Sequence, residues 1–473
     1  MSSMTGPEPG RLPSAPPEAW QPLLKLRRAA RRPVERFLRI EAASGILLLV
    51  AAAVALVWAN SAWVDTYVAL WRTPLGIRVG GFSFERTLQW LVNDGLMVIF
   101  FFVVGLEIRR EIHAGELSEL RRAALPAAAA LGGMLAPAGL YLVFAGGPST
   151  RAGWGIPMAT DIAFAVGILA LLGKRVPDAL RVLLLALAVI DDLGAIIVIA
   201  IFYSAGVSIS ALIVAALGLL AIFGMQRLGV RSKVAYIAPA LVVWGGVYAA
   251  GIHPTIAGVI VGLVTPVRAW FGPEGFVSGV RKELDQLEQG SDETSATHQL
   301  SGALHHVDVA RREAMSPAES LIEILHPWVA YAIMPLFALA NAGVSVSASS
   351  LDESAWRVLT GVGVGLMVGK PLGVLVISWL TLRIGVASLP AGLTFRHLSV
   401  LGLVAGVGFT MSLFIAQLAL DELQLLAAAK LGVLVASAGA ATLGLALGRA
   451  LLRETPTEGV AQSADEAESS TEY

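Results

Sequence analysis

Two acidic residues, Asp191 and Asp192, lie side by side inside an apolar stretch of the chain. VLLLALAVI precedes them at 182–190 and LGAIIVIAIF follows them at 193–202. A carboxylate at the centre of a bilayer-spanning helix costs about 2.5 to 3.5 kcal/mol on insertion scales. Folding does not require that cost, so the pair predicts a functional site within the membrane. The alternative interpretation is a structural polar pair buried between helices.

A second polar site is expected at Thr160 and Asp161, in the segment WGIPMATDIAFAVGILALLG. Gly155 and Pro157 interrupt the apolar pattern just before this acid. A helix broken at membrane depth is tolerated only where its freed backbone groups line a cavity or pack in protein. Glycines punctuate residues 397–419 in a similar way, and two interrupted spans are typical of inverted-repeat transporters with a midplane site. Asp161 alone is also consistent with a helix cap.

Lys370 is the third polar group, in VGLMVGKPLGVLVISWL. A lysine buried in the middle of a membrane must lose its proton or find a carboxylate. We therefore expect a charge partner for Lys370 among the buried acids. A purely structural salt bridge is the alternative, because buried pairs are often neither strongly stabilising nor functional.

The composition defines the elements that must position these groups. The chain has 473 residues, of which 56% are hydrophobic and 15% charged, and its mean hydropathy is +0.72. These values exclude an ordinary soluble globular protein. Continuous apolar stretches recur near the ~20 residues that a spanning helix needs, which favours helices over a barrel. There is no cysteine, which excludes disulfides, thiol catalysis and cysteine-ligated metal centres.

The predicted fold is an all-α polytopic membrane protein with twelve transmembrane helices. Spans are expected at 40–60, 88–109, 122–145, 154–172, 178–203, 207–226, 234–250, 253–267, 325–345, 356–382, 397–419 and 423–448. If both termini are cytoplasmic, 27 of the 34 Lys and Arg residues fall in inner segments and five in outer ones. That asymmetry supports the count and the orientation.

Segments outside the membrane complete the predicted organisation. Residues 1–39 are predicted to be a disordered, basic cytoplasmic leader, and 451–473 a disordered acidic cytoplasmic tail. The transporter domain at 40–450 includes a polar cytoplasmic loop at 269–322, expected to be part helix and part disordered. Residues 66–87 alternate around Gly80-Gly81, which predicts an external β-hairpin.

Two other functional classes are less consistent with these motifs. An intramembrane aspartyl protease needs one acid from each of two facing helices, whereas the closest acids here are adjacent, and the chain has no GxGD motif. A passive cation channel needs a continuous pore, and the broken helices and the midplane lysine argue against one. Flux measurements separate a channel from an exchanger.

In several segments the chain resembles the bacterial NhaA-type sodium/proton antiporter family. The similar segments, in the family's order, are LVNDGLMVIFFFVVGLEIRREIHAGEL, GIPMATDIAFAVGILALLGKRVP, ALAVIDDLGAIIVIAIFYS, HPTIAGVIVGL, LHPWVAYAIMPLFALANAGV, GKPLGV and GFTMSLFIA. They cover residues 40–450 apart from the long loop. That family is itself an established example of inverted repeats with interrupted helices crossing at the midplane, so the resemblance implies this architecture here.

The resemblance also implies roles for the midplane residues. Asp192 corresponds to the principal cation-binding, proton-carrying carboxylate, and Asp191 assists it. Thr160 and Asp161 lie where the two broken helices cross. Lys370 corresponds to the family lysine that pairs with the first aspartate, here Asp191. Neighbouring helical residues point ~100° apart, which agrees with unequal roles for the two acids.

Five further residues receive roles from the resemblance. Glu107, Arg110 and Glu111 correspond to a cytoplasmic entrance that takes part in pH regulation. The alternative interpretation is that they are the charged, positive-inside flank of a transmembrane helix. His253 corresponds to a pH-response histidine, and histidine titrates near physiological pH. It is also consistent with a helix-start histidine. Asp94 is a candidate for the external entrance, with an interfacial acid as the alternative.

The function implied is secondary antiport of Na⁺ or Li⁺ against H⁺, not enzymatic catalysis, and no cofactor is expected. At low pH buried acids hold protons, and as they ionise they attract a small hard cation. A site that opens alternately to each side then exchanges one for the other. The family implies two protons per Na⁺, pH regulation and a homodimer joined through the external hairpin 66–87. We expect a multi-pass protein of the bacterial inner membrane, surrounded by lipid, with no nucleic-acid partner.

Overall fold

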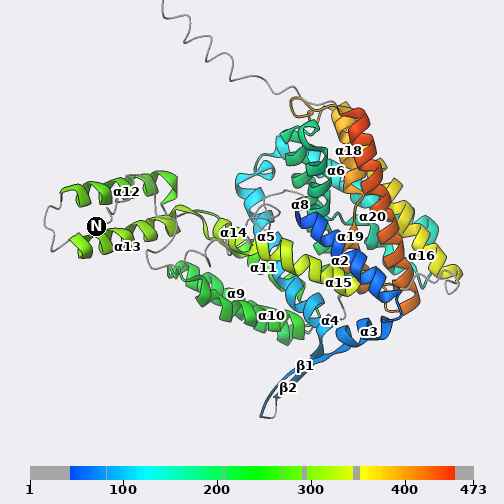
Figure 1. The fold of residues 1–473 in the computed structure, drawn as a ribbon, viewed down its shortest axis with the longest axis horizontal. Coiled ribbons are helices and arrows are strands. Elements are labelled where there is room, and N and C mark those ends of the chain that lie inside the picture. Colours follow the sequence, from blue (N-terminus) through cyan, green and yellow to red (C-terminus); the bar gives the residue numbers. More distant parts are fainter. Residues whose placement is uncertain are drawn as a thin grey trace, which may run out of the picture.

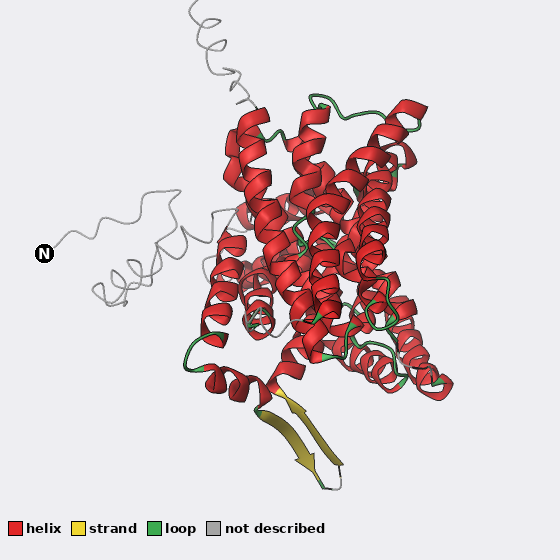
Figure 2. Ribbon diagram, turned by 90° about the vertical axis from the view of Figure 1, so that its right-hand side faces the viewer, coloured by secondary structure: helices red, strands yellow, loops and turns green. Residues whose placement is uncertain are grey.

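The computed structural model describes residues 43–80, 82–204, 206, 208–269, 271–289, 296–344 and 352–452. Helices dominate this part of the chain, and one two-stranded sheet projects from it (Figure 2). The predicted leader at 1–39 and all but the first two residues of the predicted tail at 451–473 lie outside the described residues.

The first half of the chain contributes most of the helices around the acidic pair. They are α2 (Ala43–Ala59), α3 (Val64–Arg72), α4 (Leu88–Trp90), the π-helix η1 (Leu91–Leu96), α5 (Met97–Ala114), the 3₁₀ turn η2 (Glu116–Ser118), α6 (Leu120–Ala145), the 3₁₀ helix η3 (Arg151–Met158), α7 (Ile162–Leu172), the 3₁₀ turn η4 (Gly173–Arg175), α8 (Asp178–Phe202), α9 (Ile209–Arg227), the 3₁₀ turn η5 (Lys233–Tyr236), α10 (Ile237–Ala249) and α11 (Thr255–Val264).

The second half adds a helical pair and the remaining spans. These elements are α12 (Gly272–Gln289), α13 (Ala296–Ala314), α14 (Pro317–Trp328), the π-helix η6 (Val329–Ile333), α15 (Met334–Asn341), α16 (Glu353–Val364), the π-helix η8 (Gly365–Gly369), α17 (Lys370–Ile384), α18 (Phe395–Ala405), α19 (Phe409–Ala419) and α20 (Leu423–Leu451). Helices α12 and α13 pack on each other and project from the bundle (Figure 1).

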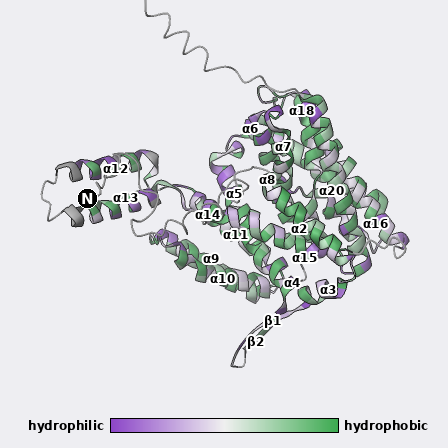
Figure 3. Cartoon of the chain, in the orientation of Figure 1, coloured by the Kyte–Doolittle hydropathy of each residue, from purple (hydrophilic) through white to green (hydrophobic). Residues whose placement is uncertain are grey.

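The helices have the length and the apolar surface of membrane spans. Eight stretches of the described residues are long and apolar enough to cross a membrane, and ten qualify if each of two bent pairs is one span. The bent pairs are α2 with α3, at 115°, and α18 with α19, at 46°. Two shorter apolar helices lie at Lys233–Ala249 and Thr255–Val264. The apolar character runs along the whole bundle (Figure 3), so the protein is an all-α polytopic membrane protein.

Glycines allow neighbouring helices to approach closely. A Cβ on Gly132 of α6 would lie 2.7 Å from the carbonyl carbon of Gly373 on α17. A Cβ on Gly105 of α5 would lie 2.6 Å from the carbonyl oxygen of Val259 on α11. Small residues at such crossings are how helices associate within lipid, where no hydrophobic effect drives them together. These crossings hold α17, with Lys370, against α6, and α11 against α5.

The β-hairpin is shorter than the sequence predicts. Strands β1 (Pro74–Val79) and β2 (Phe82–Thr87) pair antiparallel, with Val79 opposite Phe82 across the turn. Residues 66–72, which the sequence interpretation includes in the hairpin, belong instead to helix α3. The apolar and aromatic residues of VDTYVALWR recur at helical spacing, and Tyr67 and Trp71 are buried. We call the end of the bundle that carries β1 and β2 the hairpin end.

The polar loop expected at 269–322 also differs in extent. Most of it forms α12 and α13, and α14 already begins at Pro317. Ser316 caps α14: its hydroxyl accepts a hydrogen bond from the backbone N–H of Glu319, whose side chain accepts one from the backbone N–H of Ser316. This reciprocal capping box starts the helix five residues before the predicted end of the loop.

Candidate functional site

Helix α8 carries the acidic pair into the core of the bundle. Asp191 and Asp192 are each 1% exposed, and most of the apolar residues that precede them in 182–190 are buried as well. One carboxylate oxygen of each residue, Oδ1, is buried without a hydrogen-bond partner in the described part of the chain. A carboxylate oxygen can only accept hydrogen bonds or bind a cation or proton. Each of these two oxygens is therefore an acceptor that remains available to a proton or a cation.

Lys370 is the counter-charge of Asp191. Its Nζ lies 2.7 Å from Asp191 Oδ2, and both side chains are fully buried. The same ammonium group donates a hydrogen bond to the backbone carbonyl of Met158, at the end of η3. Thr160 Oγ1 lies 2.7 Å from Asp191 Oδ2 as well. Asp191 is thus held by two partners, whereas no ion pair or hydrogen bond to described residues holds Asp192 Oδ1.

The chain is extended between η3 and α7, and this break lies against the one between α18 and α19. Ala159 and Asp161 have extended backbone angles. The backbone N–H of Asp161 donates to the carbonyl of Val407, 2.8 Å away, and Thr160 Oγ1 lies 3.1 Å from the carbonyl oxygen of Ala405. Backbone groups freed by each break therefore find partners at the other, as burial in an apolar medium requires.

Asp161 caps both broken helices. Its Oδ1 accepts from the backbone N–H of Phe164 in α7 at 3.0 Å. Its Oδ2 accepts from the backbone N–H of Thr410 in α19 at 3.1 Å and from the Thr410 hydroxyl at 2.5 Å. With these hydrogen bonds made, Asp161 has the contacts of the helix cap that the sequence left open as an alternative. It is also close enough to Asp192 to repel a charge there.

Sequence reasoning missed two hydroxyl residues of this region. Thr410 is fully buried on Asp161, and Ser412 Oγ donates to the carbonyl of Ile156 at 2.7 Å. Both lie in GFTMSLFIA, directly after the break at Gly406–Gly408. Their position in the sequence could have indicated them. Each hydroxyl follows a glycine-rich interruption of an apolar span, where freed backbone groups need polar partners.

Charges around Asp192 come from several helices. Asp191, Glu107 and Asp161 all act on it as negative groups, and Lys370 acts as a positive one. Glu107 lies on α5 and interacts with Arg110, which is exposed. Within the described residues, no three His, Asp or Glu side chains gather as they would around a resident metal ion.

The residues that the resemblance connects with pH response lie in two separate places. Glu107, Arg110 and Glu111 lie together near the end of α5, where Glu111 Oε1 accepts from the backbone N–H of Glu116 at 2.7 Å. His253 lies apart from these three residues. Its Nε2 lies 3.4 Å from Asp94 Oδ1, at the hairpin end of the same span.

The separation follows from helix packing. Asp94 and Glu107 are 13 positions apart in the chain, which is about 20 Å along a helix. Helix α11 packs in parallel against α5, because Gly258 faces Val98 and Gly262 faces Gly105. Its first residues, next to His253, therefore lie at the Asp94 end. Asp94 and His253 form one pair, and Glu107 belongs to the opposite half of the span.

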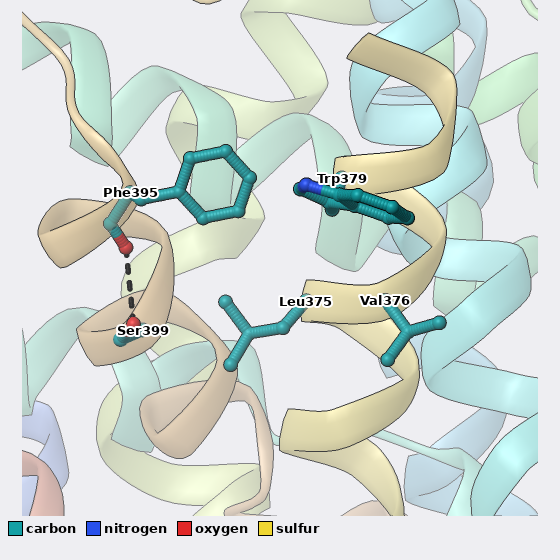
Figure 4. A pocket seen from close by; sticks show the side chains of 5 residues that line it. All are labelled: Leu375, Val376, Trp379, Phe395 and Ser399. Atoms are coloured by element: carbon teal, nitrogen blue, oxygen red, sulfur yellow. Dashed lines mark hydrogen bonds between the residues drawn. The ribbon is translucent and has the colours of Figure 1, made fainter. Parts of the chain in front are cut away.

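One groove lies apart from these residues. It has a volume of about 270 Å³ and is lined by Leu375, Val376, Trp379, Phe395 and Ser399 of α17 and α18 (Figure 4). No candidate site residue lines it, and it offers no charged group. The polar chemistry of the protein is therefore buried between helices and does not lie in this groove.

Known proteins similar to this chain match nearly all of it. A family profile described as Na⁺/H⁺ antiporter 1 matches residues 35–447. A Na⁺/H⁺ antiporter NhaA 2 of Myxococcus xanthus is 68% identical over 471 residues, which are 100% of both chains. The protein of the same name in Sorangium cellulosum is 54% identical over 98% of this chain and 99% of its own. A Na⁺/H⁺ antiporter NhaA of Bordetella petrii is 50% identical over 92% of this chain and 95% of its own. The chain therefore belongs to the Na⁺/H⁺ antiporter 1 family.

Proposed function

We propose that this protein is a secondary transporter that exchanges Na⁺ or Li⁺ for H⁺. The observation that carries the proposal is the buried doublet, in which Lys370 neutralises Asp191 while Asp192 keeps a carboxylate oxygen without a partner in the described residues. The printed names of the relatives, all Na⁺/H⁺ antiporters, support the same function. We propose Asp192, with Asp191, as the cation ligands and Thr160 as the residue that positions Asp191.

The proposed frame has twelve crossings in two inverted repeats, with the two interrupted spans crossing at the midplane. The mutual hydrogen bonds of Asp161 with Val407 and Thr410 support this crossing. Beyond the eight long helices, four more crossings come from α2, the two shorter apolar helices and the bent pair α18–α19. The excess of Lys and Arg in alternate connections supports cytoplasmic termini and an external hairpin end in a bacterial inner membrane.

The exchange step follows from competition for the same oxygens. In the proton-loaded state Asp192 carries a proton, and the Asp191–Lys370 pair carries a second one on the lysine. When the site faces the cytoplasm both protons leave, and Na⁺ binds to the two carboxylates in their place. After reorientation Na⁺ leaves to the outside and two protons return. Each cycle then moves two positive charges in and one out, so the exchange is electrogenic and the proton gradient drives Na⁺ export.

We also propose that the two entrances regulate this exchange. Glu107, Arg110 and Glu111 would form the cytoplasmic entrance, where Glu107 acts electrostatically on Asp192. His253 and Asp94 would respond to pH at the other end, through their contact at 3.4 Å. The hairpin offers two edges with unpaired backbone groups, and a second copy of the chain could pair there to form the homodimer.

Everted membrane vesicles test the proposed function directly. Respiration establishes a pH gradient, and added Na⁺ should collapse it even when valinomycin and K⁺ clamp the membrane potential. A passive cation channel cannot couple Na⁺ to H⁺, so under the same clamp it would leave the gradient intact. Vesicles from cells without the protein give the background rate.

A further inference from the structure

Three carboxamide side chains from distant parts of the sequence meet near the hairpin end. Asn93 Nδ2 donates to Gln417 Oε1 at 2.6 Å, and Asn341 Nδ2 donates to Asn93 Oδ1 at 2.7 Å. Gln417 Nε2 donates to Asn341 Oδ1 at 2.5 Å. Each amide thus gives and receives a hydrogen bond within the group, and the three join η1, α15 and α19.

An aromatic layer lies next to this group. Phe414 contacts Phe101 and Phe337, with ring centroids 5.2 and 6.2 Å apart, and each ring is at most 1% exposed. Phe414 also meets the ring of His253 at 5.3 Å. Phe337 precedes Asn341 by one helical turn on α15, and its carbonyl accepts from Asn341 Nδ2 at 2.9 Å. The amides and the rings therefore form two adjoining layers.

One face of α19 connects these layers to the buried acids. Thr410, Phe414 and Gln417 are spaced four and three residues apart, which places them on the same helix face. Thr410 binds Asp161, Phe414 completes the aromatic layer, and Gln417 joins the amides. Along this face the amides lie about 10 Å from the Asp161 contact, since each residue rises 1.5 Å. The aromatic and amide layers therefore lie between the Asp161 contact and the hairpin end.

We propose that Asn93, Asn341 and Gln417 form an amide latch that holds α19 against η1 and α15 and closes the hairpin-end entrance. The inference rests on the proposed exchange, because alternating access requires this end to open. Opening must separate the three amides, which satisfy one another only while the helices are together. The three are positioning residues: they control which side the site faces and do not bind the transported ion in this closed state.

A reversible cross-link across the latch is the first test. The natural chain has no cysteine, so Asn93→Cys with Gln417→Cys introduces one defined thiol pair. After treatment with a short bis-methanethiosulfonate, Na⁺-dependent H⁺ exchange in proteoliposomes should fall at least about tenfold, and dithiothreitol should restore it. Each single variant with the same reagent is the control. Unchanged exchange by the fully cross-linked pair would overturn the latch.

A second test removes one amide without a cross-link. Gln417→Met keeps the length of the side chain but not its hydrogen bonds. Because the latch stabilises the closed state, the half-saturating Na⁺ concentration should fall about threefold to tenfold at the hairpin end and rise at the opposite end. Gln226→Met is the control, since Gln226 donates to the carbonyl of Val264 on α11, away from the latch.

The outcomes separate the latch from a merely structural role and from the proposed function. A structural role would lower the maximal rate, or shift both half-saturating concentrations in the same direction, and either result overturns the latch. Wild-type protein is measured first in the same vesicles. If it shows no Na⁺-dependent H⁺ movement, the proposed function itself fails; if it exchanges and both latch tests are negative, only the latch fails.

Discussion

Replacing Lys370 by methionine should destabilise the protein in a pH-dependent way. Methionine keeps the unbranched stem of the lysine but removes the charge that lies 2.7 Å from Asp191 and the hydrogen bond to the Met158 carbonyl. Removing one member of a buried ion pair costs about 3–5 kcal/mol, because the other charge stays buried without compensation. We expect the variant to lose unfolding free energy of this size at pH 8.

Acid should relieve most of that loss. A buried carboxyl without a counter-charge is favoured in its neutral form, so Asp191 of the variant takes up a proton as the pH falls. The folded variant then binds more protons than the unfolded chain, and its stability rises toward low pH. At pH 5 only the lost hydrogen bonds should remain, at about 0.5–1.5 kcal/mol each.

Unfolding of the detergent-solubilised protein between pH 5 and 8.5 measures both effects. Lys430→Met is the matched control: Lys430 is also buried, but no described residue forms an ion pair with it. That variant should be neutral or more stable, because it removes an uncompensated buried amine. A loss below about 1 kcal/mol for Lys370→Met at pH 8, or one that does not shrink in acid, would refute the role of Lys370 as the counter-charge.

Three other substitutions test the frame of the site. Asp161→Ala removes the caps of both α7 and α19 and should cost about 2–4 kcal/mol of unfolding free energy. The control Asp352→Ala removes the cap of α16 alone and should cost about half as much. Equal losses for the two variants would contradict the double cap. Thr160→Val keeps the shape of the side chain but releases Asp191, and should raise the half-saturating Na⁺ concentration about tenfold in a transport assay; an unchanged value would remove Thr160 from the site. Gly132→Ala places a methyl group against the backbone of Gly373 and should cost about 1–3 kcal/mol of unfolding free energy, which lowers the melting temperature. Gly139→Ala, on the same helix but facing open space, should leave the melting temperature unchanged.

Much of the helical frame could be predicted from the sequence because a bilayer imposes a strong constraint. Apolar runs of spanning length marked most of the helices, and an acid within such a run is costly enough to be informative by itself. Asp191 and Asp192 stood out for this reason, and so did Lys370. The residues alone left the partner of Lys370 open, because Asp191 lies 179 positions away in the sequence. The family resemblance named Asp191 as that partner, and the structure shows the two groups in contact.

The features that the sequence did not reveal depend on tertiary contacts. Thr410 is an unremarkable hydroxyl until its helix meets Asp161, which lies 249 positions earlier. The three amides of the latch are isolated in the sequence, and only the packing of η1, α15 and α19 brings them together. His253 reaches Asp94 because α11 runs parallel to α5. The local pattern predicted helix α3 less well, because its residues also alternate as they would in a strand of the neighbouring hairpin.

Exchange by Asp192→Asn in proteoliposomes tests the central claim most directly. Asparagine is nearly isosteric with aspartate but cannot release a proton or carry the negative charge that attracts Na⁺. With internal pH and internal Na⁺ recorded together, wild-type protein should move the two ions in opposite directions. The variant should move neither, although it reconstitutes and melts like the wild type. Coupled Na⁺ and H⁺ movement by the variant at the wild-type rate would contradict Asp192 as the carrier of the exchanged ions.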